Sequence, residues 1–249
     1  MSGPPSRPVA LVVALTLAIG GLVISGISGF VGGFVGALLT VGAGAGESTV
    51  ATALLVAVLL AATEAGFIVV GYAFRQTDDG AGIRVDWLPS NGPTTRDATL
   101  IVGATAALVA VNRLSFWAGS LVGIDPVTAV TTPEQFSATL LALLVPTMLL
   151  AVGPAEEYLF RGVVQGYLER TFPARRALGL SAGLFTLVHL PNLISNPEAG
   201  TVSVPLWLVI GVVLGWLYQR TEALLVPVLV HGCYNVAALS LLFAELGAV

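Results

Sequence analysis

Long apolar runs follow one another along almost the whole of this chain, and they restrict its fold more than any other feature. A helix of roughly 20 apolar residues spans the hydrocarbon core of a bilayer. Only 10% of the 249 residues are charged, whereas soluble proteins carry about 25%. The sequence therefore predicts an all-α, polytopic integral membrane helical bundle. The runs lie near residues 9–41, 50–74, 98–121, 136–153, 177–194, 204–218 and 223–242.

The first run is longer than one membrane crossing needs and is rich in glycine. It is either one tilted helix with a small-residue packing face or a broken hairpin. The bundle is thus expected to have seven transmembrane helices, or eight if this run is split. Because the apolar runs extend almost from end to end, residues 1–249 are expected to form a single transmembrane domain.

Arginine placement predicts the orientation of the bundle, because basic residues favour cytoplasmic loops. In the seven-helix arrangement the opposite loops contain acidic residues, at positions 47, 125, 134 and 198, and no arginine. We therefore expect a multi-pass protein of the cell membrane with a cytoplasmic N-terminus. The 14 acidic and 10 basic residues argue against a nucleic-acid partner. Eight arginines fall on one side: Arg7, Arg75, Arg84, Arg96, Arg170, Arg175, Arg176 and Arg220.

Three charged residues interrupt the fourth apolar run, in the stretch GPAEEYLFRG that begins at Gly153. An ion inside a membrane costs at least a few kcal/mol unless it is paired or faces water. Glu157 and Arg161 are four residues apart on one helix face, so they can pair. Glu156 points about 100° away and is free to face a cavity. Pro154 is expected to start or kink a helix, and a helix start would place its positive end beside both carboxylates.

Both histidines of the chain also lie deep in apolar runs. His189 closes the stretch FTLVH, four residues after Phe185, and His231 opens the stretch HGCYN, four residues before Asn235. At about 1.5 Å per residue from the nearest flanking arginine, Glu156, His189 and His231 lie about 21, 20 and 17 Å deep. Three separate helices are therefore expected to bring these polar groups to one depth.

This set of side chains is suited to hydrolysis. A carboxylate in a partly dry pocket is a competent general base toward water near neutral pH. A histidine can assist that base, and an asparagine amide can stabilise an oxyanion. Alternatively Glu156, His189 and His231 could hold zinc or another divalent metal with an open position for water. The sequence does not choose between a metal-held water and a glutamate-activated one.

The three motifs, in this order and each on a membrane helix, resemble those of the CAAX protease and bacteriocin-processing (CPBP) family, which includes the Rce1-type prenyl proteases. The resemblance covers residues 139–244, which it identifies as a CPBP-like catalytic core. It implies that Glu156 is the catalytic glutamate, that His189 works with it on water, and that His231 and Asn235 complete the site. Glu157, Arg161 and Phe185 are then the remaining motif residues.

The same resemblance implies an intramembrane endopeptidase or metalloprotease whose partners are the lipid bilayer and a peptide or prenylated protein substrate. Both a divalent metal and a metal-free glutamate mechanism are compatible with the family. The active site is expected to open toward the cytoplasmic side of the membrane.

Other functions compete with this interpretation. The stretch GISG around Ser28 resembles the GxSG of rhomboid serine proteases, although small residues recur throughout that run as packing residues. A proton-coupled transporter would also use intramembrane carboxylates and histidines. Glu64 and Arg113 favour that alternative, but an ion pair between them is the simpler expectation. A non-catalytic membrane scaffold or immunity protein is the remaining possibility.

Overall fold

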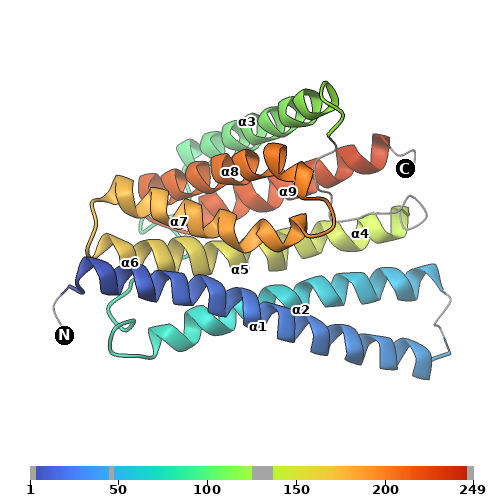
Figure 1. Ribbon diagram of the computed structural model, residues 1–249, viewed down its shortest axis with the longest axis horizontal. Coiled ribbons are helices and arrows are strands. Elements are labelled where there is room, and N and C mark those ends of the chain that lie inside the picture. The colour runs from blue at the N-terminus through green and yellow to red at the C-terminus, as the bar shows by residue number, and fades with distance from the viewer. Residues whose placement is uncertain (1–3, 45–47, 125–136, 246–249) are drawn as a thin grey trace.

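The computed structural model describes residues 4–44, 48–124 and 137–245. These residues form a bundle of helices packed side by side along one long axis, and no strand occurs among them (Figure 1). The predicted fold class, an all-α membrane bundle, is therefore confirmed. Of the residues used above to predict orientation, Glu47, Asp125 and Glu134 lie outside the described residues.

The seven predicted spans each correspond to a helix, and the first run is one continuous helix rather than a hairpin. Among the described residues, six helices are long and apolar enough to cross a membrane. The exception is α7, which with 16 residues is shorter than a full crossing requires. The helices are α1 (Arg7–Gly42), α2 (Thr49–Arg75), α3 (Thr95–Ser120), a continuous helix Ala138–Glu169 that includes α4, α5 and α6, α7 (Ala174–His189), α8 (Gly200–Thr221) and α9 (Leu225–Glu245).

The two N-terminal helices pack against each other through small residues. A Cβ atom on Gly66 of α2 would collide with the backbone of Ser25 on α1, and one on Gly29 of α1 would collide with the side chain of Thr63 on α2. In a bilayer, such small residues let two helix backbones approach closely and gain van der Waals contact. Of the two alternatives for the first run, the structure therefore has the single helix with a small-residue packing face.

The remaining helices place the C-terminal half of the chain at the centre of the bundle. In Figure 1, α1 and α2 lie along one side and α3 along the other, with the helix Ala138–Glu169, α7, α8 and α9 between them. The side chain of Asn112 on α3 donates a hydrogen bond of 3.1 Å to the hydroxyl of Tyr234 on α9, and both residues are buried. The central helices are thus enclosed on both sides.

The helix ends that carry arginine gather at one end of the bundle. The N-terminus, the α2–α3 connection, the α6–α7 connection and the α8–α9 connection lie at the same end in Figure 1. Direct contacts join three of them: the Thr171 hydroxyl donates to the carbonyl oxygen of Pro5 at 3.1 Å, and Arg170 donates to the carbonyl oxygen of Asp79. We call this the arginine-rich end. That it faces the cytoplasm remains a prediction.

The α2–α3 connection is more than the solvated loop that its polar sequence suggests. The backbone N–H groups of Leu224 and Leu225 donate to the carbonyl oxygens of Asp86 and Trp87, at 2.9 and 3.0 Å. The Trp87 ring stacks on Tyr158 with centroids 6.0 Å apart and planes 5° apart. This connection therefore fixes the turn between α8 and α9 against the helix that carries the central carboxylates.

The close packing of α1 on α2 predicts a selective effect of added methyl groups. Gly66→Ala should lower the free energy of unfolding by roughly 1–3 kcal/mol, because the new Cβ collides with backbone atoms that cannot rotate away. Gly26→Ala is the matched control, since a Cβ there meets nothing within 4 Å. Thermal unfolding of the detergent-solubilised proteins measures the stability of both variants. Equal stability of Gly66→Ala and the wild type would contradict this packing.

Candidate active site

The two central carboxylates lie inside a continuous helix. The helical backbone runs from Ala138 to Glu169, with π-helical turns before and after the five-residue segment α5 (Gly153–Glu157). Such π-helical turns within α-helices frequently occur at functional sites. A helix start at Gly153 is therefore not observed, and no free helix terminus stabilises the carboxylates. Their stabilisation has to come from side chains of neighbouring helices.

A close crossing of α5 and α9 brings those side chains within reach. A Cβ atom on Gly153 would lie 3.0 Å from the carbonyl oxygen of Val228, and one on Gly232 would lie 3.1 Å from a methyl group of Leu149. Each helix thus has a glycine at the crossing point, and the missing side chains allow the two backbones to approach closely. Because His231 precedes Gly232 directly, its side chain reaches the carboxylates on α5.

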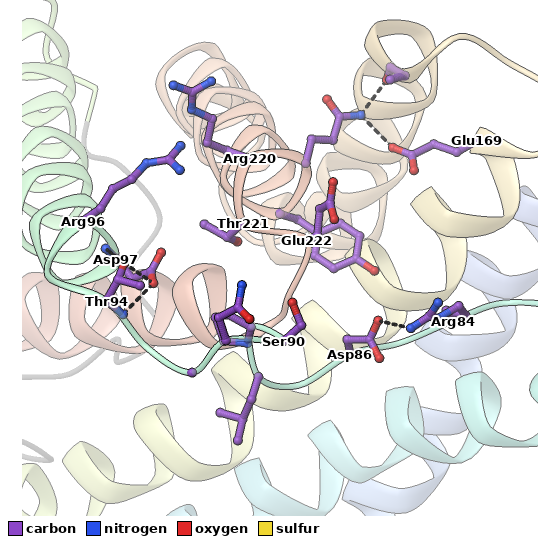
Figure 2. A pocket seen from close by; sticks show the side chains of 17 residues that line it. Arg84, Asp86, Ser90, Thr94, Arg96, Asp97, Glu169, Arg220, Thr221 and Glu222 are labelled. Carbon is purple, nitrogen blue, oxygen red and sulfur yellow. Dashed lines mark hydrogen bonds and ion pairs between the residues drawn. The ribbon is translucent and has the colours of Figure 1, made fainter.

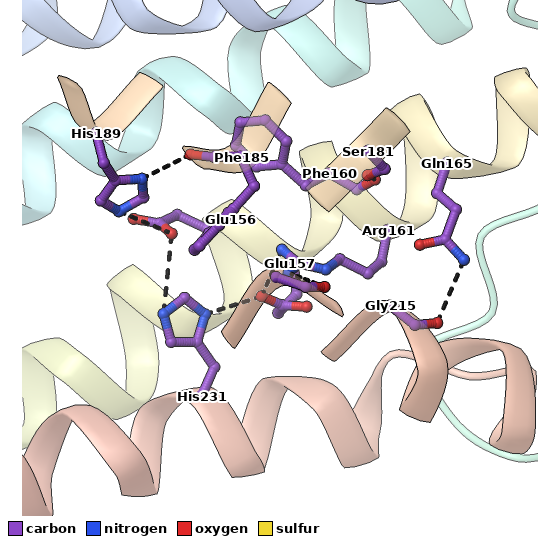
Figure 3. A network of polar contacts seen from close by, with 11 residues as sticks. Glu156, Glu157, Phe160, Arg161, Gln165, Ser181, Phe185, His189, Gly215 and His231 are labelled. Carbon is purple, nitrogen blue, oxygen red and sulfur yellow. Dashed lines mark hydrogen bonds and ion pairs between the residues drawn. The ribbon is translucent and has the colours of Figure 1, made fainter. Parts of the chain in front are cut away.

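Glu157 and Arg161 form the predicted ion pair, with the Arg161 Nη1 atom 3.0 Å from Glu157 Oε1. Both side chains are almost completely buried, at 0% and 1% exposure. Arg161 also donates from Nη2 to the carbonyl oxygen of Gly211 at 3.2 Å, and its guanidinium lies 4.6 Å from the centre of the Phe185 ring. The Nδ1 atom of His231 lies 2.8 Å from the same Glu157 oxygen. The ion pair therefore holds one histidine in place (Figure 3).

Glu156 lies next to Glu157 on α5 and faces His189 of α7 and His231 of α9. Its Oε2 atom lies 3.8 Å from Nε2 of His231 and 4.0 Å from Nε2 of His189, and the two rings lie on opposite sides of the carboxylate in Figure 3. These distances are too long for direct hydrogen bonds. The side chain of His189 is 20% exposed, against 8% for Glu156 and 5% for His231. The group is thus largely buried, with His189 its most accessible member.

Hydrogen bonds at Nδ1 determine which ring nitrogens face Glu156. The Nδ1 atom of His189 lies 2.8 Å from the carbonyl oxygen of Phe185, and that of His231 lies 2.8 Å from the Glu157 carboxylate. Both partners are acceptors, so each Nδ1 carries the hydrogen and donates it. In the neutral rings both Nε2 lone pairs then face Glu156. A water molecule in this space could donate one hydrogen to the Oε2 atom of Glu156, which has no hydrogen-bond partner among the described residues, and the other to one of the two Nε2 atoms.

Aromatic rings enclose this group. The Phe185 ring lies 4.6 Å from the ring of His189 and 5.9 Å from that of His231, measured between centroids. Trp207 of α8 lies 5.4 Å from His189 on the same measure. Apolar rings around a carboxylate limit the access of bulk water and strengthen the electrostatic interactions within. Phe185 belongs to one of the predicted motifs, whereas no sequence motif indicated Trp207.

Two residues that the sequence analysis proposed are not joined to the group by hydrogen bonds. Asn235 is half-buried on α9, one turn after His231, and its side chain forms no hydrogen bond with the other described residues. Ser28, the nucleophile of the rhomboid alternative, is half-buried on α1 and forms no hydrogen bond with either histidine. The observed contacts therefore group Glu156, His189 and His231, and the role of Asn235 stays a prediction.

The expected ion pair between Glu64 and Arg113 is wrong. Arg113 pairs instead with Glu245 near the end of α9, and both of those side chains are partly exposed. Glu64 is 6% exposed, and its Oε2 atom has no hydrogen-bond partner among the described residues. It interacts electrostatically with Glu156. Glu64 is thus a second carboxyl group near the site, and its position in an apolar run was the only sequence signal for it.

Glu156, His189 and His231 are the candidate ligands for a divalent metal. A carboxylate and two histidine nitrogens are a suitable set of donors for catalytic zinc. Two ligands at 2.1 Å from a tetrahedral zinc lie about 3.4 Å apart, whereas the separations from Glu156 to the histidines are 3.8 and 4.0 Å. No three His, Cys, Asp or Glu residues in the described ranges are arranged so that they could hold a metal ion. The arrangement therefore does not fit a metal as it stands, and the choice between a metal-held and a glutamate-activated water is left to the experiment described below.

The buried ion pair predicts a large loss of stability when one partner is removed. Arg161→Ala should lower the free energy of unfolding by about 3–5 kcal/mol, because it leaves the Glu157 charge buried without its cation. Arg113→Ala removes a partly exposed pair and should cost less than about 1 kcal/mol. The double variant Glu157→Gln/Arg161→Met removes both charges and should recover part of the loss. Thermal unfolding in detergent checks all three. A normal melting temperature for Arg161→Ala would rule out the pair as a stabilising element.

Comparison with known proteins gives one family. Residues 138–237 match the family described as Type II CAAX prenyl endopeptidase Rce1-like. This segment contains all three motifs and the close crossing of α5 and α9. Neither the curated proteins nor the solved structures contain a match to the chain. The resemblance that the motifs predict is confirmed for residues 138–237, the part of the chain that holds the candidate active site, which match the Rce1-like family.

Proposed function

We propose that this protein is an intramembrane endopeptidase in which Glu156 activates water for attack on a peptide bond. The observation that carries the proposal is the position of Glu156 between two histidine Nε2 atoms, at 3.8 and 4.0 Å, in a largely buried site. The Rce1-like match supports the general class of reaction. The division of roles among the residues is our inference from their geometry.

The reaction begins with a water molecule in the space between Glu156 and the histidines. Glu156 accepts a proton from this water, and the water oxygen attacks the carbonyl carbon of the substrate. The proton on Glu156 then passes to the nitrogen of the leaving amine as the C–N bond breaks. The water donates its second hydrogen to the Nε2 atom of one histidine, which orients the water oxygen toward the carbonyl carbon. Water adds across the amide bond, so atoms and charge balance.

The surrounding residues orient these groups. His231 donates from Nδ1 to Glu157, which is itself paired with Arg161, and His189 donates from Nδ1 to the backbone of Phe185. These Nδ1 contacts fix the two imidazole rings so that their Nε2 atoms face the space that holds the reacting water. Such fixed positions of polar groups lower the barrier to hydrolysis. Asn235 is proposed as an oxyanion donor only by its resemblance to the family motif.

The proposed substrate is a peptide or a prenylated protein segment that reaches the site from the bilayer. The burial of the site among membrane helices and the family description support this class. A prenyl group would anchor a substrate in the hydrocarbon, at the depth where Glu156 lies. Opening of the site toward the cytoplasm, with a cytoplasmic N-terminus, rests on the arginine distribution alone.

Replacement of the proposed base predicts loss of cleavage without loss of the fold. Glu156→Gln should reduce turnover by at least ~10²-fold, because an amide cannot accept the proton of water. His189→Ala and His231→Ala should each lower turnover as well. Profiling of new peptide termini in membranes with wild-type protein or Glu156→Gln identifies the substrate, and a prenylated and an unprenylated version of that peptide then test the need for the lipid.

Glu198→Gln is the matched control, because it makes the same chemical change at an exposed position at the start of α8. It should cleave at the wild-type rate. Turnover by Glu156→Gln equal to that of this control would remove Glu156 from the mechanism. Solute flux driven by protons, without any cleavage, would favour the transporter alternative.

The separations within the site predict that cleavage does not depend on a metal. Wild-type protein that has been incubated with a strong chelator and desalted should retain its activity, and metal analysis should find less than one equivalent of zinc. The reason is that Glu156, His189 and His231 stand farther apart than the ligands of one ion. Loss of activity that zinc restores would instead establish the metal-held water.

A further inference from the structure

A cavity of about 740 Å³ lies at the arginine-rich end, far along the helices from Glu156. It is bounded by the α2–α3 connection, the start of α3 and the ends of α6 and α8 (Figure 2). Its volume falls in the range of small-molecule sites, roughly 300–1,000 Å³. Nothing in the proposed hydrolysis uses this cavity, so its charged lining needs a separate explanation.

Most of the charges around the cavity are already engaged. Asp97 accepts hydrogen bonds from the backbone and hydroxyl of Thr94, at 2.9 and 2.7 Å. Glu169 accepts from the side-chain amide of Gln219 at 2.7 Å. Asp86 pairs with Arg84 at 3.4 Å. These acidic residues are thus held by partners within the protein.

Three charged side chains at the cavity have no such partner. Arg96 attracts the neighbouring Asp97 electrostatically but forms no ion pair with the described residues. The side chains of Arg220 and Glu222 form neither an ion pair nor a hydrogen bond with those residues. In Figure 2 the two guanidinium groups extend toward the same region of the cavity, and Glu222 lies nearer its centre. The unengaged charges are therefore two cations and one anion.

This set fits a ligand that has a phosphate and a primary ammonium. Arginine binds phosphate oxygens through paired N–H donors, and a carboxylate accepts hydrogen bonds from an ammonium group. Leu88, which is 60% exposed, also lines the cavity and gives it an exposed apolar edge. Helix ends at a membrane surface meet the lipid headgroups. A lipid of the surrounding bilayer is thus the ligand that the position and the charges favour.

We propose that this cavity binds the headgroup of a phosphatidylethanolamine-type lipid. Its phosphate contacts Arg96 and Arg220, and its ammonium contacts Glu222. The acyl chains leave the cavity past Leu88 into the bilayer. This binding is independent of the proposed peptidase activity.

Competition among lipids with different headgroups tests the proposal. Purified, delipidated protein in detergent is mixed with equal amounts of phosphatidylethanolamine, phosphatidylglycerol and phosphatidylcholine, and native mass spectrometry counts the lipids retained. The wild type should retain phosphatidylethanolamine in preference to the other two. Phosphatidylglycerol lacks the ammonium, and the methylated ammonium of phosphatidylcholine cannot donate to Glu222.

Variants of the three residues separate their roles. Arg96→Gln and Arg220→Gln should each reduce retention of phosphatidylethanolamine roughly five-fold, while Arg220→Lys keeps the charge and most of the binding. Glu222→Gln should abolish the preference over phosphatidylglycerol. Arg175→Gln is the control, since Arg175 is exposed at the same end but does not line the cavity. A melting temperature close to that of the wild type shows that each variant is folded.

Three results would overturn the proposal. The first is equal retention of the three lipids by the wild type. The second is a loss in Arg175→Gln as large as that in Arg220→Gln, which would indicate only a general attraction of the basic surface. The third is binding of soluble phosphoethanolamine without retention of the lipid, which would make a free metabolite the ligand. Displacement of the lipid by soluble phosphoethanolamine would support a headgroup site.

Discussion

The ion pair of Glu157 and Arg161 is the interaction on which the centre of this protein depends. Each ion alone would be strongly unfavourable among membrane helices, and together they are tolerated only with further hydrogen bonds. Those bonds come from different helices: the carbonyl oxygen of Gly211 lies on α8, and the imidazole of His231 lies on α9. The Phe185 ring of α7 covers the guanidinium. One buried pair thus determines how three neighbouring helices are placed around the segment that carries it.

Glu156 differs from Glu157 because no cation neutralises it. Its neighbours are two histidines whose hydrogens are used elsewhere and a second unpaired carboxyl group, Glu64. Adjacent residues on one helix therefore have contrasting surroundings. Through Oε1, Glu157 is paired with Arg161 and bonded to His231, whereas Glu156 has no ion pair with an arginine and no hydrogen-bond partner at Oε2 among the described residues. Two neighbouring carboxylates in contrasting environments can take different roles in one site, and here the role of general base falls to Glu156 in our proposal.

Sequence reasoning succeeded where the physics is local. The four-residue spacing of Glu157 and Arg161 fixes their pairing on any helix, and depth along each helix follows from its rise per residue, so the approach of Glu156, His189 and His231 was predictable. The helix start considered at Gly153 is not observed, but the wrong ion pair concerns a contact between helices. Glu64 and Arg113 are both single charges in apolar runs, but which helices adjoin depends on packing across the whole bundle. Arg113 therefore forms its ion pair with Glu245, which is distant in the sequence, and not with Glu64.

The packing of α8 on the central helix shows why such contacts escape local patterns. Arg161 and Gln165, four residues apart, donate to the carbonyl oxygens of Gly211 and Gly215, which are also four apart. A Cβ on Gly215 would lie 2.9 Å from the Gln165 side chain, so the hydrogen bond from Gln165 to the Gly215 carbonyl oxygen requires a glycine at this position. The same row continues to Glu169, which accepts from Gln165 at 3.2 Å and lines the cavity at the arginine-rich end. In the sequence alone, each of these glycines resembles an ordinary packing residue of a membrane helix. Only the pairing of two helices shows that they carry a polar row from the buried ion pair to the surface.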